Sequence, residues 1–224
     1  MVAALLTAVV LAGCGAAVIH EPPPGKIVHV TVDSAVDPND REAVAGWADA
    51  IFVGTVQKYL STEAPESRTP ETQYQVSVVD ELKGDLPATV VVNQLGGTAR
   101  NGDIVVVDNV PPLDREKTYL FTTRYYAEKK WLTMAFAREL AGPEAEAAQR
   151  AGKNPADRAA EPEAVKRMRD AITHEKPFGD EVTRPKLPDP ASLPSNVTGI
   201  PTPTKTPSTT PKPTGSTNPP SPTR

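Results

Sequence analysis

The sequence is poor in the residues that build disulfides, metal sites and large cores. It contains a single cysteine in 224 residues, which excludes an intramolecular disulfide and the zinc sites made of several cysteines. Aromatic residues amount to only 5% and there are 25 prolines, so one packed core cannot extend along the whole chain. The formal net charge of −4 argues against a general nucleic-acid-binding protein, which usually carries a basic surface.

Motifs of the common catalytic sites are also absent. There is no Gly-x-Ser-x-Gly nucleophile elbow, phosphate-binding loop or His-Glu-x-x-His zinc motif. His20 and His29 could share a metal only with a third ligand that is not evident, and His174 is isolated. The acidic residues at 80–81 and 114–116 fall at strand ends and turns, where we expect solvated charges. We therefore expect no cofactor and no metal, while a pair of carboxylates from separate strands stays open as an alternative.

The N-terminus is an uncharged, apolar segment. Residues 2–13 are too few to cross about 30 Å of hydrocarbon as a helix, and their length is typical of a signal-peptide core. The segment ends Leu11-Ala12-Gly13-Cys14, which resembles the bacterial lipobox. The resemblance implies cleavage between Gly13 and Cys14 and a diacylglyceryl group on the Cys14 thiol, with two or three acyl chains holding the protein on the membrane. The alternative is an uncleaved apolar N-terminus.

The C-terminus is rich in proline and threonine and has almost nothing to bury. Such a segment cannot offset its ordering entropy, so we expect it to be disordered or extended as polyproline II. From Val182 onward it carries five basic residues and one acidic residue, a net charge of about +4. It could lie along an anionic wall polymer, although the weak charge favours a plain solvated tail.

Between these ends, short segments with strand periodicity follow one another, so we expect a largely antiparallel sheet. A mid-strand Gly54 predicts a bulge, and Asn101-Gly102 predicts a hairpin turn. Asp37 and Pro38 predict the N-cap and first residue of a short helix that ends near residue 50. The predicted strands cover residues 26–33, 50–60, 72–84, 88–95, 103–110, 118–126 and 131–138.

Residues 143–173 read as helical, with proline near the start of each helix. Val165, Met168 and Ile172 form a narrow apolar stripe, which we expect to pack on the sheet. A helix that binds a partner is the alternative.

The stretches ADAIFVGTV, YQVSVVDELKG, VVVNQLGG and PLDREKTYLF, within residues 48–121, carry a family resemblance. They are similar to the small OB-like barrels of bacterial extracytoplasmic lipoproteins, and in outline to the TIMP and netrin-like domains. The resemblance implies a closed five-stranded barrel. The inhibitors of that family act through a free N-terminal cysteine, whereas lipid would block Cys14 here, and the family's disulfide cysteines are missing. The inhibitory mechanism is therefore not carried over.

The segment RYYAEKKW, residues 124–131, is the most suggestive surface. Basic and aromatic residues meet at one predicted hairpin tip, and arginine and aromatic residues are enriched at interface hot spots. Tyr125 and Tyr126 must face opposite sides of the strand, so an ordinary hairpin with one tyrosine in the core is the alternative. The candidate partner-binding residues are Arg124, Tyr126, Lys129, Lys130 and Trp131.

These observations predict a mainly β protein with a small antiparallel OB-like barrel, a short N-terminal helix, a C-terminal helical extension and a disordered tail. The expected regions are a signal peptide (1–13), a linker after the lipidated cysteine (14–25), the barrel (26–140), the helical extension (141–178) and the tail (179–224).

The expected function is non-catalytic binding at the bacterial cell envelope by a lipoprotein anchored on the extracytoplasmic side of the membrane. Its partners would be the membrane, through the anchor, and an envelope protein or an anionic wall polymer, with no nucleic acid. The alternatives are an envelope enzyme with a carboxylate-based site acting on wall polymer, and a passive spacer.

Overall fold

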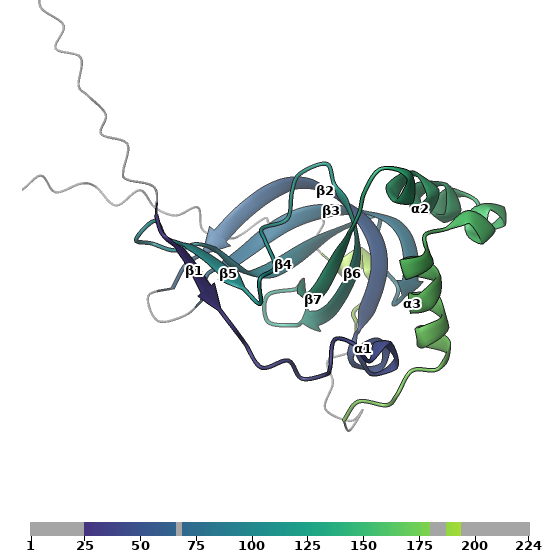
Figure 1. Cartoon of the computed structure of the whole chain (residues 1–224), viewed down its shortest axis with the longest axis horizontal. Coiled ribbons are helices and arrows are strands. Elements are labelled where there is room, and N and C mark those ends of the chain that lie inside the picture. Colours follow the sequence, from purple (N-terminus) through teal and green to yellow (C-terminus); the bar gives the residue numbers. More distant parts are fainter. Residues whose placement is uncertain (1–24, 66–68, 180–186, 194–224) are drawn as a thin grey trace, which may run out of the picture.

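The computed structural model describes residues 25–65, 69–179 and 187–193. The fold is mainly β, as predicted, with a barrel of strands and helices packed against it (Figure 1). Its elements are β1 (Ile27–Val30), α1 (Arg41–Trp47), β2 (Ala50–Glu63), β3 (Glu71–Lys83), β4 (Thr89–Thr98), β5 (Ile104–Val107), β6 (Thr118–Tyr126), β7 (Trp131–Leu140), α2 (Pro143–Lys153) and α3 (Glu163–Thr173), with 3-10 turns at Pro155–Ala160 and Pro190–Ser192.

Five of the described strands close into a barrel in the order β4-β3-β2-β6-β7, and β7 returns to β4. Neighbouring strands are antiparallel except at this closing seam, where β4 and β7 run parallel and Val92 lies opposite Leu132. Counted from β2, this is the strand order of an OB-fold barrel, so the predicted fold class is confirmed. Closure pairs each barrel strand on both sides and removes exposed edges.

Apolar side chains from all five barrel strands fill the interior. Phe52 on β2 and Phe121 on β6 are fully buried and stack with their ring centroids 5.1 Å apart. The bulge predicted at Gly54 is confirmed, because the register with β3 shifts between Val53 and Gly54. A Cβ at Gly54 would lie 2.6 Å from Cγ1 of Val76, so glycine lets the two strands approach here.

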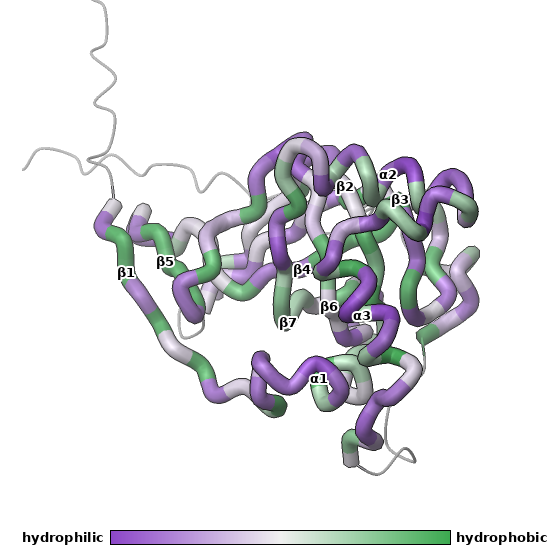
Figure 2. Tube along the Cα trace, turned by 45° about the vertical axis from the view of Figure 1, so that its right-hand side comes forward, coloured by the Kyte–Doolittle hydropathy of each residue, from purple (hydrophilic) through white to green (hydrophobic). Residues whose placement is uncertain are grey.

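Strand β1 lies outside the barrel. It pairs in parallel with β5, and the side chains of Ile27 and Val28 are exposed. Strand β5 follows β4 through the predicted turn at Asn101-Gly102, where Gly102 has a φ of 87°. From β1 the chain runs to α1 along the outside of the barrel as an irregular connection over residues 31–40 (Figure 2).

The predicted start of the first helix is wrong. Helix α1 has Asp40 as its N-cap, whose carboxylate accepts the N–H of Ala43 at 3.0 Å. Asp37 instead accepts the N–H of Asn39 at 2.9 Å, which closes a turn before the helix begins. The helix also ends before residue 50, because β2 begins there.

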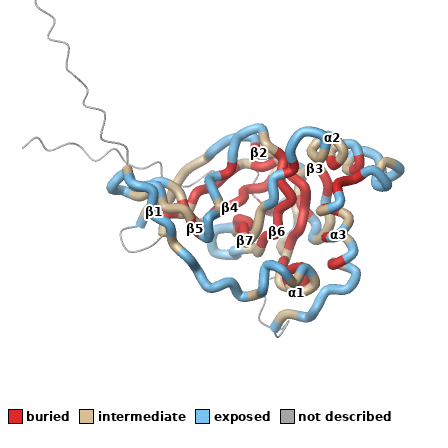
Figure 3. The backbone as a smooth tube through the Cα atoms, in the orientation of Figure 1, coloured by how far each residue is buried: buried red, intermediate tan, exposed pale blue. Residues whose placement is uncertain are grey.

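Helices α1 and α3 enclose a second apolar core against the outer wall of the barrel (Figure 3). The predicted stripe on α3 does pack on the sheet, since Val165 and Met168 are buried in one cluster with Ile51 and Val53 of β2. Packing of this amphipathic face, more than intrinsic propensity, holds an eleven-residue helix such as α3 in place.

The prediction of a solvated Asp80 is wrong, whereas Glu81 and residues 114–116 are exposed as expected. The guanidinium of Arg169 on α3 contacts the Asp80 carboxylate, and its Nε donates to Glu161 at 3.1 Å. The side chains of Asp80 and Glu161 are only 6% and 4% exposed. Arg169 therefore clamps α3 to β3 by compensating two buried charges.

The predicted signal peptide, with Gly13 and Cys14, lies outside the described residues, and so do His20 and residues 194–224 of the tail. Among the helices that the structure describes, none is long and apolar enough to cross a membrane.

Candidate functional site

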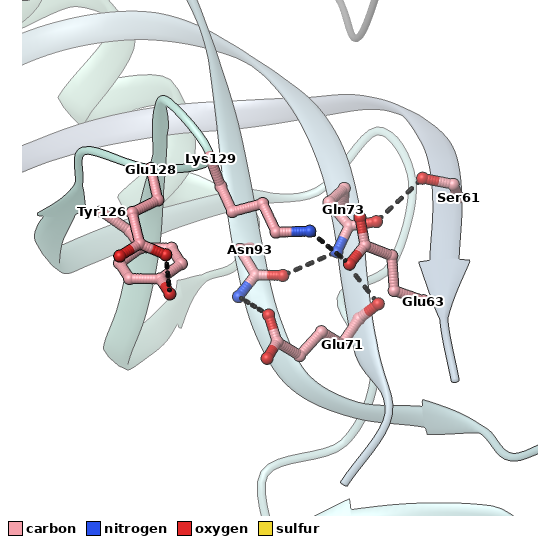
Figure 4. A network of polar contacts seen from close by, with 8 residues as sticks. All are labelled: Ser61, Glu63, Glu71, Gln73, Asn93, Tyr126, Glu128 and Lys129. Atoms are coloured by element: carbon pink, nitrogen blue, oxygen red, sulfur yellow. Dashed lines mark hydrogen bonds and ion pairs between the residues drawn. The ribbon is translucent and has the colours of Figure 1, made fainter. Parts of the chain in front are cut away.

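A row of polar side chains crosses three strands on the outer wall of the barrel (Figure 4). Ser61 of β2 lies opposite Gln73 of β3, which lies opposite Asn93 of β4. The next residues along, Tyr74 and Val92, belong to the barrel core, so Gln73 and Asn93 point outward because strand side chains alternate. The row therefore belongs to the surface of the barrel and contributes nothing to its apolar filling.

Hydrogen bonds join the row into one network. Ser61 Oγ donates to Gln73 Oε1 at 2.8 Å, and Gln73 Nε2 donates to Asn93 Oδ1 at 2.8 Å. Asn93 Nδ2 donates in turn to the Glu71 carboxylate at 3.1 Å. Gln73 and Asn93 are 0% and 1% exposed, and buried amides are tolerated only when they are paired in this way.

A lysine from the β6–β7 hairpin reaches across this row. Lys129 Nζ lies 5.3 Å from the centroid of the Trp131 ring and 2.8 Å from the Glu63 carboxylate at the end of β2. The hydrogen bond to Glu63 raises the pKa of Lys129 above its usual value. We call Lys129 and its bond to Glu63 the strap, and the strap with Ser61, Glu71, Gln73, Asn93 and Tyr126 the strap surface.

The strap is a weak attachment. The side chains of Lys129 and Glu63 are 44% and 31% exposed, so water screens their charges. An ion pair this exposed stabilises a protein by about 0–1 kcal/mol. The strap can therefore open at little cost in stability, and it lies beside the polar row.

Aromatic side chains flank the strap. Tyr126 is 43% exposed and its hydroxyl donates to Glu128 at 3.0 Å, and this bond raises the pKa of the phenol. Tyr125 packs against the barrel core, so the two tyrosines face opposite sides as predicted. Trp131, expected at the exposed tip, is instead only 3% exposed, and its indole N–H has no hydrogen-bond partner among the described residues.

The predicted cluster of five residues is divided in the structure. Tyr126, Lys129 and Trp131 lie together at the strap, and Lys130 occupies the exposed turn with a φ of 58°. Arg124 is engaged elsewhere.

The guanidinium of Arg124 lies 5.1 Å from the centroid of the Trp47 ring on α1. Its Nε is 3.7 Å from the Asp49 carboxylate, which also accepts the N–H of Tyr125 at 2.9 Å. Asp49 thus ties the start of β2 to the end of β6, and Arg124 serves that junction rather than the hairpin tip.

No metal-binding group of three or more histidine, cysteine, aspartate or glutamate side chains occurs within the described ranges. The ring of His29 bonds to Asn109 at 3.1 Å, and that of His174 bonds within α3 to the carbonyl of Asp170. Neither imidazole therefore belongs to a group of described side chains that could hold a metal ion.

Sequence reasoning missed most of the strap surface. Its missed members, Ser61, Glu63, Glu71, Gln73 and Asn93, are ordinary polar residues of β-strands. The only signal was the alternation of polar and core residues along β3 and β4, which shows that a residue points outward but not which residues become neighbours.

No protein-family model matches this chain, and a search of the curated proteins found no match to it. What the strap surface binds can therefore be inferred only from its side chains.

Proposed function

We propose that the protein is a lipid-anchored, extracytoplasmic binding protein of the bacterial cell envelope, and that it binds its partner through the strap surface without catalysis. The observation that carries this proposal is the buried row of neutral amides beneath a weak, exposed ion pair. A hydrogen bond between neutral groups contributes only about 0.5–1.5 kcal/mol net, so the amides on this outer wall can exchange their partners for those of a ligand once the strap opens.

The charges around the row favour a protein partner over an anionic wall polymer. Three carboxylates stand there, those of Glu63, Glu71 and Glu128, and Lys129 is already bonded to the first. Amide groups such as those of Gln73 can both donate to and accept from a peptide backbone. An exposed tyrosine at the rim adds the contact area that interfaces favour.

The anchor part of the proposal rests on the sequence Leu11-Ala12-Gly13-Cys14. Intact mass of the protein extracted from bacterial membranes tests it, with Cys14→Ser as the control. Loss of the first thirteen residues and gain of a lipid mass, both abolished by Cys14→Ser, is the expected result. An unmodified chain would contradict the anchor but would leave the binding surface untouched.

Photo-crosslinking of the full chain on intact cells tests the binding surface. A photoreactive residue placed at Tyr126 is compared with one at Glu146, which is 74% exposed on α2. We expect a discrete crosslinked protein from position 126 only, and its loss when Glu71→Gln removes the charge that holds Asn93. Equal products from both positions, or none from position 126, would contradict the proposal.

One observation favours an enzyme as the second candidate. Glu63 and Glu71 are directly opposite each other on β2 and β3, so two carboxylates from separate strands share one face. Each already accepts a hydrogen bond, from Lys129 and from Asn93, which suits positioning better than proton transfer. Conversion of purified wall polymer by the protein, lost in both Glu63→Gln and Glu71→Gln, would support the enzyme instead.

A further inference from the structure

A groove separate from the strap lies between the β1–α1 connection and the neighbouring strands β4, β5 and β7. It has a volume of about 600 Å³ and is mostly apolar. The connection over residues 31–40 forms one wall, and strands β4, β5 and β7 form the other. The apolar residues that define it include Val36, Trp47, Leu95, Val110, Met134 and Phe136.

Two features of the groove indicate what would fill it. The rings of Trp47 and Phe136 line the groove, while the Trp47 indole N–H is buried below its surface without a hydrogen-bond partner among the described residues. Grooves lined by aromatic rings are the surfaces that bind proline-rich segments in peptide-recognition domains. Asp33 and Asp108 are exposed and line the groove, so they give it negative charge. The guanidinium of Arg124, which lies over the Trp47 ring, already faces the Asp49 carboxylate. The groove therefore suits an apolar segment that carries positive charge.

The chain itself contains such a segment. Residues 194–224 include nine prolines, three basic residues (Lys205, Lys212 and Arg224) and no acidic residue. Proline-rich segments favour polyproline II, whose exposed carbonyls and pyrrolidine rings bind grooves lined by aromatic side chains. Pro201, Pro203 and Lys205 place two rings and a cation within five residues.

We propose that the groove beneath the β1–α1 connection binds the proline-rich C-terminal segment of the same chain, around residues 200–213. The prolines of the segment pack on the rings of Trp47 and Phe136, and Asp33 and Asp108 attract its lysines. The segment binds non-covalently, and its binding does not involve the strap surface.

The segment is long enough to reach. Leu193 is the last described residue and is buried in the barrel core. Eleven residues lie between it and Lys205, and at about 3.1 Å per residue in polyproline II the twelve steps from Leu193 to Lys205 span about 37 Å. A domain of this size has a radius of gyration of about 15 Å, so the span is comparable to its diameter. Attachment to the barrel gives the segment a high effective concentration at the groove.

Paramagnetic NMR on the full chain tests the proposal. A nitroxide is attached at Thr206→Cys in a Cys14→Ser background, and the two indole N–H signals are compared. We expect several-fold stronger broadening of Trp47 than of Trp131, whose indole N–H is also buried without a partner but lies outside the groove. Equal broadening of the two signals, or none at Trp47, would overturn the proposal.

Three variants sharpen the test. Asp33→Lys should abolish the selective broadening by reversing a rim charge. Replacing Pro201, Pro203 and Pro207 with alanine should also reduce it, whereas the same change at Pro219, Pro220 and Pro222 should not. Retained broadening in the first two variants would overturn the proposal. Broadening that arises only between molecules, seen when spin-labelled and isotope-labelled chains are mixed, would show docking between copies and would overturn it as well.

Discussion

The helix-covered side of the barrel and the strap surface both bury polar groups, but they hold them in opposite ways. On the helix side, Arg169 compensates two carboxylates that are 6% and 4% exposed. At the strap, Lys129 pairs with one carboxylate while both side chains stay partly in water. Beneath the strap, the buried groups are neutral amides.

This difference determines which side can open. Removing a partner from a buried ion pair leaves an uncompensated charge and costs several kcal/mol, so the helix clamp is fixed. Separating an exposed pair costs little, and the amides beside it can bond to water or to a partner. The helix side thus maintains the fold, whereas the strap surface is available for binding.

Breaking the clamp should give the largest effect. Arg169→Met leaves Asp80 and Glu161 buried without their cation, so we expect a loss of about 3–5 kcal/mol in the free energy of unfolding. Urea unfolding measures this loss. The matched control is Arg167→Met on the same helix, since Arg167 pairs with Glu163 in an exposed position and should cost less than about 1 kcal/mol. Similar losses in both variants would contradict a buried clamp.

The buried phenol of Tyr74 in the barrel interior should lower the stability of the protein at high pH. Burial raises the pKa of Tyr74 to about 12, above its ordinary value of 10.0. The unfolded chain therefore loses this proton first, and stability should fall between about pH 10 and pH 12 by about 3 kcal/mol. Unfolding measured across that range should show a shallower pH dependence in Tyr74→Phe. An unchanged slope would contradict burial of the phenol.

The amide row should behave as a coupled unit. Gln73→Leu removes a partner from Ser61 and from Asn93, and we expect a loss of about 1–3 kcal/mol in the free energy of unfolding. Asn93→Leu should have a similar cost. The double variant should cost less than the sum, because neither amide is then left unpaired. Additive losses in urea unfolding would show that the two side chains do not interact.

Releasing the strap should have the smallest effect on stability. Lys129→Ala should lower the free energy of unfolding by less than about 1 kcal/mol, yet it uncovers the Trp131 ring. Acrylamide quenching of tryptophan fluorescence should therefore increase. Lys130→Ala is the control, because that neighbouring lysine lies in the exposed turn, and quenching should stay at the level of the unmodified protein. A large loss of stability in Lys129→Ala would place the strap among the fixed parts of the fold.

The sequence predicted the barrel because strand periodicity and turn residues act locally. Gly54 and the Asn101-Gly102 turn could be placed from their own neighbourhoods. The helix start failed because two aspartates compete as caps, and the structure shows that Asp37 closes a turn while Asp40 caps the helix.

The site could be predicted only in part. The β6–β7 hairpin is one continuous segment, so Tyr126, Lys129 and Trp131 were found together. The amide row joins residues that are 12 and 20 positions apart in the sequence. Their alignment depends on the register shifts between β2 and β3, which the sequence does not show. Arg124 was misplaced because its partners, Trp47 and Asp49, come from a distant part of the chain.

The measurement that most directly tests the contrast between the two sides is side-chain 15N relaxation dispersion on the full chain. It reports opening on the microsecond to millisecond timescale at individual nitrogens. We predict exchange at the side-chain amides of Gln73 and Asn93, lost or accelerated in Lys129→Ala, and none at Nε of Arg169. Exchange at Arg169 with rigid amides beneath the strap would contradict the assignment of the strap surface as the side that opens to bind.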